Sequence, residues 1–149
     1  MKAHGMAGHL IRRLNQISTH VFAQRAQEAG IDLTPVQFAA MDAISTYPGI
    51  DQAGVAAKIA YDRATIGGVI DRLEQKGYVT RNVCKHDRRA REVRLTEEGN
   101  QVFNQSLPVI SSLQIDILPG LEHTERARFL ELAQKAVDSF SEMPFRPKD

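Results

Sequence analysis

The chain has 149 residues, of which 42% are hydrophobic and 25% are charged, and its formal net charge at pH 7 is +1. This length favours one modest domain over two large ones. No apolar run approaches the roughly 18 residues of a membrane span, and the first residues lack a signal-peptide core, so we expect a cytoplasmic protein. The single cysteine, Cys84, cannot form an internal disulfide, which is typical of a reducing compartment.

Helical periodicity predicts two helices in the first third of the chain. The first runs over about residues 8–28 and ends at Gly30. The second begins after Thr34, a good N-cap, with Pro35 at its favoured first position, and is broken by Pro48 and Gly49. Apolar residues recur at helical spacing in the first helix, at Leu10, Leu14, Ile17 and Val21. The second helix is expected to carry Phe38, Met41, Ala43 and Ile44 inward.

The next segment predicts a helix-turn-helix. Residues 52–60 and 63–75 read as two helices, with Asp51 and Asp62 placed to cap them and Gly77 ending the second. The apolar residues that recur at helical spacing are Val55, Ile59, Ile66, Val69, Ile70 and Leu73. A surface of arginines and short side chains remains on the second helix, and such a surface can approach base edges closely.

A β-hairpin with a basic loop should follow. Residues 78–84 alternate as a strand does, Val93 and Leu95 share one face of a second strand, and residues 85–91 form the loop between them. Thr96 is placed to cap a long helix over 97–118, in which Pro108 should introduce a kink.

The last helix is expected over about residues 124–140. Its apolar side comprises Phe129, Leu132, Ala133, Ala136, Val137 and Phe140. Together with the first helix, it offers more apolar surface than one small domain readily covers. We therefore expect pairing with a second copy of the chain; packing of these faces within one chain is the alternative.

Charge is unevenly distributed along the sequence. Residues 61–94 contain nine basic and five acidic residues, a local net charge of +4, whereas residues 97–142 contain three basic and eight acidic residues, a local net charge of −5. Positive charge therefore gathers on the predicted second helix and hairpin, where a phosphate backbone would bind. A hairpin that is merely solvated is the alternative.

Two motifs in this region resemble the MarR family of winged helix-turn-helix regulators. One is Asp87-x-Arg89 followed by Val93-x-Leu95-Thr96-x-x-Gly99, and the other is the stretch 62–77. The resemblance covers about residues 8–140. It implies a mainly α fold with a small β-hairpin wing, in which a winged helix-turn-helix of about residues 34–96 is flanked by dimerisation helices over about 8–33 and 97–142. It also implies a homodimer that regulates transcription, more commonly as a repressor than as an activator.

The candidate DNA-binding residues follow from residue type and from this resemblance. Arg63 and Thr65 would contact base edges in the major groove, Gly68 would permit a close approach, and Arg72 would contact phosphate. Arg89 matches the wing-tip arginine of the family and would enter a minor groove, with Asp87 holding its guanidinium. The remaining phosphate contacts are predicted for Lys85, Arg88 and Arg91. A two-fold dimer predicts a pseudo-palindromic operator with half-sites about 10 base pairs apart.

A small-molecule effector is predicted from a polar strip on the first helix. Helical spacing aligns His9, Arg12, Arg13 and Gln16, and an arginine pair fits a carboxylate. The segment resembles the first helix of family members that control aromatic-acid catabolism, which implies an aromatic carboxylate or phenol as the effector. Two alternatives are salt bridges between subunits and simple solvation.

Other chemistry finds little support in the sequence. The five histidines are scattered without metal-ligand spacing, no Gly-rich phosphate loop is present, and no nucleophile has a matching base, so we expect no metal, no cofactor and no enzyme. Cys84 ends a wing strand and is interpreted as a structural thiol. Two functional alternatives remain, namely a winged unit that binds a protein and a regulator without an effector.

Overall fold

The computed structural model describes residues 1–59, 63–87 and 89–141, apart from the side chains of residues 63 and 141. It is mainly helical with one antiparallel hairpin, which confirms the predicted fold class. Its elements are η1 (Lys2–Gly5), α1 (Ala7–Glu28), α2 (Pro35–Thr46), α3 (Gln52–Lys58), α4 (Arg63–Gln75), β1 (Val79–Val83), β2 (Arg91–Leu95), α5 (Glu97–Ile117) and α6 (His123–Ser141).

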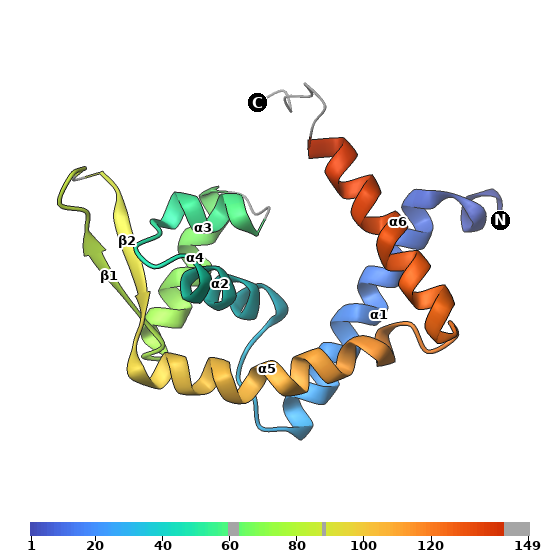
Figure 1. Ribbon diagram of the computed structural model, residues 1–149, viewed down its shortest axis with the longest axis horizontal. Coiled ribbons are helices and arrows are strands. Elements are labelled where there is room, and N and C mark those ends of the chain that lie inside the picture. The colour runs from blue at the N-terminus through green and yellow to red at the C-terminus, as the bar shows by residue number, and fades with distance from the viewer. Residues whose placement is uncertain (60–62, 88, 142–149) are drawn as a thin grey trace.

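The long helix α5 connects two regions of different character (Figure 1). At its N-terminal end lie α2, α3, α4 and the hairpin, which form the winged unit. Near its C-terminal end, α5 lies alongside α1, and α6 follows after a turn. The helix continues through Pro108 without interruption. In the described residues, no helix combines the length and the apolarity needed to cross a membrane.

The predicted caps and stops explain most of the boundaries. Thr34 forms a capping box with Gln37, the Asp51 carboxylate accepts the Gly54 N–H at 2.7 Å, and Gly77 ends α4 with φ +80°. α3 ends at Lys58, two residues earlier than predicted, and the other predicted ends agree or differ by one residue. The predicted Asp62 cap lies outside the described residues.

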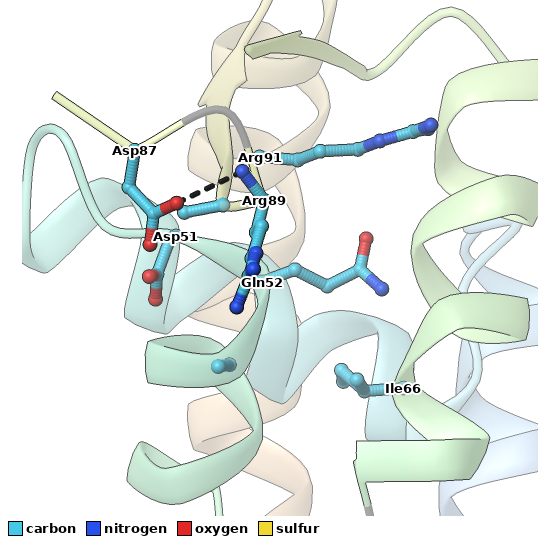
Figure 2. Close-up of a pocket in the computed structure, with 8 residues that line it drawn as sticks. Asp51, Gln52, Ile66, Asp87, Arg89 and Arg91 are labelled. Carbon is cyan, nitrogen blue, oxygen red and sulfur yellow. Dashed lines mark hydrogen bonds between the residues drawn. The ribbon is translucent and has the colours of Figure 1, made fainter. Parts of the chain in front are cut away.

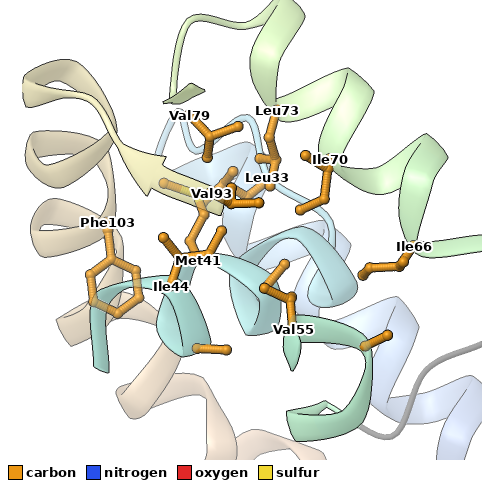
Figure 3. Packing of buried hydrophobic residues seen from close by; sticks show 13 residues of the cluster. Leu33, Met41, Ile44, Val55, Ile66, Ile70, Leu73, Val79, Val93 and Phe103 are labelled. Atoms are coloured by element: carbon orange, nitrogen blue, oxygen red, sulfur yellow. The ribbon is translucent and has the colours of Figure 1, made fainter. Parts of the chain in front are cut away.

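The main core fills the winged unit (Figure 3). β1 and β2 pair in register from Val79 with Leu95 to Val83 with Arg91, and this brings Val79 and Val93 onto the core. The Phe38 and Phe103 rings stack at 5.3 Å between centroids and join α2 to α5. The buried side chains of this core are Leu33, Ala40, Met41, Ala43, Ile44, Val55, Ala56, Ile66, Ile70, Leu73, Val79, Val93 and Phe103.

The apolar stripe on α1 is only partly buried in its N-terminal half. A smaller core between α1 and α5 consists of Phe22, Ala26, Ile110 and Leu113. Leu10, by contrast, is 49% exposed, and α6 likewise leaves Phe140 63% exposed. Of the periodic residues in α1, Val21 packs against this smaller core. The other large apolar side chains exposed on these two helices are Ile11, Ile17, Leu130, Leu132 and Val137.

Candidate nucleic-acid interface

Helix α4 turns one face to the core and the opposite face to solvent. Ile66 and Ile70 are buried, whereas Thr65, Gly68 and Arg72 are exposed, as their positions in the sequence predicted. A Cβ added at Gly68 would meet no atom within 4 Å. Gly68 is therefore not required for packing within the chain, and the surface around it is open to a large partner. The Arg63 side chain lies outside the described part of the structure.

The wing loop is closed by short hydrogen-bonded turns. The Cys84 N–H donates to the Ala90 carbonyl at 3.0 Å, and the Ala90 N–H donates to the Asp87 carbonyl at 3.1 Å. The Asp87 carboxylate accepts the backbone N–H of Arg89 at 2.9 Å. Asp87 thus shapes the loop backbone in an Asx turn and does not hold the Arg89 guanidinium as predicted, which leaves that guanidinium available. Arg88 lies outside the described residues.

A cavity of about 450 Å³ opens between the wing and helices α3 and α4. Figure 2 shows the Arg89 side chain extending toward α3 and that of Arg91 extending toward α4. Two guanidinium groups therefore border one concave surface between the wing and α4, where they can meet a polyanion. Its lining residues are Asp51, Gln52, Ala53, Ile66, Asp87, Arg89, Ala90 and Arg91.

The basic residues of this region divide into two groups. Lys76, Arg81 and Arg94 each form an ion pair with a carboxylate, respectively Asp32, Asp71 together with Glu74, and Glu92. Within residues 64–87 and 89–94, the cations without an ion pair are Arg72, Lys85, Arg89 and Arg91. All four are exposed. The cations free to bind an external anion are therefore residues that the sequence had assigned to DNA.

Arg81 acts as a clamp between the wing and α4. Its Nη2 donates to Asp71 Oδ1 at 2.5 Å and to Glu74 Oε1 at 3.1 Å, and its side chain is only 15% exposed. The hydrogen bond from Arg81 lowers the pKa of Glu74, and the hydrogen bonds to Glu74 and Asp71 raise the pKa of Arg81 despite its burial. Arg81 therefore supports the interface from behind, although the sequence count had placed it among the charges facing phosphate.

Replacing Arg81 with methionine should destabilise the protein, because Asp71 and Glu74 lose the cation between them. Since the folded state holds the pKa of Glu74 below its ordinary value, the contribution of the pair is present above that ordinary value and is lost as pH falls through the lower folded value. The free energies of unfolding of wild type and Arg81→Met, measured with urea, should therefore differ at pH 7, and the difference should shrink as pH falls below the ordinary pKa of a glutamate. A difference in the free energy of unfolding between the two proteins that stays constant from pH 7 to pH 3 would contradict the role of Arg81 as a clamp.

The polar strip on α1 is exposed, and its two arginines have neutral partners. Arg12 Nη2 lies 3.2 Å from His9 Nδ1, and Arg13 Nη1 donates to Gln16 Oε1 at 2.9 Å. In the described residues, no carboxylate lies within ion-pair distance of Arg12 or Arg13. The strip lies outside the cavity between the wing and α4.

Comparison with known proteins decides the family. The model of the MarR family matches residues 33–90. The chain is also 32% identical over 139 residues to the transcriptional regulator HosA of Escherichia coli O127:H6, an alignment that covers 93% of this chain and 100% of HosA. The chain belongs to the MarR family of transcriptional regulators.

Two further relatives of this MarR-family regulator agree with that result. It is 32% identical over 132 residues to the transcriptional repressor NicR of Pseudomonas putida, covering 89% of this chain and 82% of NicR. The structure of Bordetella bronchiseptica BpsR superposes with a TM-score of 0.83 at 28% identity, covering 91% of this chain and 95% of BpsR. That structure concerns the regulation of BpsR DNA binding by 6-hydroxynicotinic acid.

Proposed function

We propose that this MarR-family regulator is a homodimeric repressor that binds a pseudo-palindromic operator and is released from it by a small aromatic acid or phenol. The observation that carries the DNA-binding part is the set of unpaired, exposed cations beside the open face of α4. A polyanion placed there meets cations that form no ion pair within the described part of the chain.

Each element has a distinct role in this proposal. The exposed face of α4 enters the major groove, where Thr65 reaches base edges and Gly68 lets the helix approach closely. Arg89 enters the adjacent minor groove from the wing. The predicted phosphate contacts are Arg72, Lys85 and Arg91. Arg63 for base edges and Arg88 for phosphate remain predictions from the sequence.

The exposed apolar faces of α1 and α6 support a dimer. Isolated exposed apolar residues are ordinary, but Leu10, Ile11 and Ile17 on α1 and Leu130 and Leu132 on α6 are several on each amphipathic helix, which favours their burial against a partner. A second copy of the chain supplies a matching surface by two-fold symmetry. Light scattering should therefore report twice the chain mass of 16.6 kDa. A monomer at micromolar concentration would contradict the dimer.

A repressor needs only to occupy its operator, and the relative NicR bears the name of a repressor. DNase footprinting of the region upstream of the regulator's own gene should show one protected site with two-fold symmetry. If the regulator protects no duplex and a protein binds its winged unit instead, the alternative of a protein-binding wing replaces DNA binding.

The effector proposal rests on Arg12 and Arg13. These arginines are exposed in the single chain, close to the apolar surface assigned to the dimer, and their side chains bind only His9 and Gln16. A carboxylate would be a stronger acceptor than either neutral partner. The regulation of BpsR by 6-hydroxynicotinic acid, an aromatic carboxylate, supports the same ligand class here.

Substitution of either arginine tests this assignment. Wild type should release its operator when titrated with one member of a panel of benzoates, hydroxybenzoates and nicotinates. Arg12→Ala and Arg13→Ala should shift the half-maximal concentration of that acid upward by about tenfold or more, because a charged hydrogen bond contributes roughly 1.5–3 kcal/mol. Arg128→Ala, which removes an exposed arginine on α6, is the control. Normal responses from both strip variants would move the effector site elsewhere.

A further inference from the structure

Lys76 makes a junction between the recognition helix α4 and the linker that joins α1 to α2. The residue directly follows α4, and its Nζ donates to the Asp32 carbonyl at 2.8 Å and to Gln37 Oε1 at 3.0 Å. Asp32 Oδ1 lies 3.2 Å from the same nitrogen. An ammonium group has three protons, so these three acceptors account for all of them.

Both partners of Lys76 are held in place by other contacts. Gln37 is 5% exposed, and its Oε1 also accepts the Thr34 N–H at 3.1 Å in the capping box of α2. The linker before Asp32 is hydrogen-bonded back onto α1, because the Ile31 N–H donates to the Ala26 carbonyl at 2.8 Å. An unbroken series of short contacts therefore runs from the end of α1 through Asp32 and Lys76 to the end of α4.

We propose that Lys76 is a positioning residue that fixes the direction of α4 relative to α1, and so sets the distance between the two recognition helices of the dimer. The inference rests on the proposed function, since that distance has meaning only in a DNA-bound dimer. α1 carries part of the surface assigned to the partner copy, whereas α4 carries the surface assigned to DNA. Lys76 joins the two through the linker.

The position of Lys76 at one end of α4 means that a small movement there displaces the other end of the helix. It lies at the C-terminal end of α4, and the 13 residues of that helix place Arg63 and Thr65 about 20 Å away at the other end. A small rotation at the junction therefore displaces the proposed base-reading end by a much larger amount. A rigid junction makes the dimer sensitive to the spacing of its half-sites, and a loose junction makes it tolerant.

The test measures spacing preference with the full-length protein. The probe is a labelled duplex carrying the footprinted operator, either unchanged or with one base pair inserted between its half-sites. Wild type should bind the inserted operator at least tenfold more weakly. We call the affinity for the unchanged operator divided by the affinity for the inserted one the spacing ratio. Lys76→Met should reduce the spacing ratio to about threefold or less. Asp32→Ala, which leaves two of the three acceptors, should give an intermediate spacing ratio.

The two variants separate positioning from general electrostatics. Lys76→Met removes a positive charge and Asp32→Ala removes a negative one, so any effect of net charge on DNA affinity has opposite signs in the two proteins. The effect on the spacing ratio has the same sign in both. Asp32 is 77% exposed at its side chain, so its replacement keeps the fold. Lys135→Met, at an exposed position on α6, should keep the wild-type ratio.

The outcomes are distinguishable. If Lys76→Met and Asp32→Ala both keep the wild-type spacing ratio, the inference is overturned and the proposed function stays intact. The same holds if the spacing ratio falls in Lys76→Met alone. A wild type that binds no duplex better than unrelated DNA overturns the proposed function and the inference with it. Relaxed spacing in both variants, with Lys135→Met unchanged, supports the junction.

Discussion

Gly99→Ala is expected to lower the free energy of unfolding by about 3 kcal/mol, at the upper end of the range for overpacking. A Cβ added at Gly99 would lie 2.0 Å from the Tyr78 carbonyl oxygen and 2.9 Å from its carbonyl carbon. These are backbone atoms, so no side chain can rotate to make room.

The backbone at this point has little freedom to move. The same Tyr78 carbonyl accepts the Thr96 N–H at 3.0 Å, and the Thr96 hydroxyl donates to the Gly77 carbonyl at 2.6 Å. The Gly99 N–H donates to that hydroxyl oxygen at 2.9 Å. The first turn of α5 is thus bound directly to the turn between α4 and β1. A methyl group at Gly99 must separate the wing from the start of α5.

Gly68→Ala is the matched control for this prediction. Its added Cβ meets nothing within 4 Å, and alanine favours a helix over glycine by about 1 kcal/mol, so this variant should be as stable as wild type or more so. Urea unfolding, followed by circular dichroism, measures the free energy of unfolding of Gly99→Ala, Gly68→Ala and wild type. Equal unfolding midpoints for Gly99→Ala and wild type would show that the turn relaxes at no cost.

The double variant Arg89→Ala, Arg91→Ala is expected to lose about a hundredfold in operator affinity at roughly 100 mM salt, because a dimer loses four cationic contacts. Each lost contact also removes about 0.9 from the slope of log affinity against log salt concentration. The slope should therefore become shallower by about 3 to 4. Fluorescence anisotropy at several salt concentrations measures both quantities.

Arg94→Ala provides a control of the same residue type on the same hairpin. Arg94 already pairs with Glu92, so its removal changes the charge of the wing without removing a cation that is free to bind phosphate. Its affinity and salt slope should remain near those of wild type. The single variants Arg89→Ala and Arg91→Ala each remove the same charge as Arg94→Ala. If Arg94→Ala lost as much affinity as either of them, net charge rather than the Arg89 and Arg91 contacts would explain the binding.

Local signals in the sequence predicted the order and type of the elements. The caps at Thr34, Asp51 and Thr96 act over three residues, and a positive φ at Gly30 or Gly77 depends only on the adjacent backbone. Alternation of residue type predicted the hairpin, and the family resemblance added its relation to α4. Predictions based on such short-range chemistry agree with the structure to within two residues.

Contacts between residues far apart in the sequence could not be predicted from these local signals. The clamp joins Arg81 in β1 to Asp71 in α4, and the junction joins Lys76 to Asp32 across 44 positions of the chain. A charge count treats paired and unpaired cations alike, so it counted Arg81 with Arg89. The periodicity of α1 correctly identified an apolar face, but periodicity does not say whether that face meets the same chain or another.

The central claim is that the unpaired cations beside α4 bind DNA. The measurement that tests it most directly is a titration of the regulator onto a labelled duplex from immediately upstream of its own gene, by fluorescence anisotropy at two salt concentrations, with an unrelated duplex alongside. Tight binding that prefers the upstream duplex, weakens steeply with salt and saturates at two chains per site is the predicted result. Binding that is equal for both duplexes, or insensitive to salt, would contradict the claim.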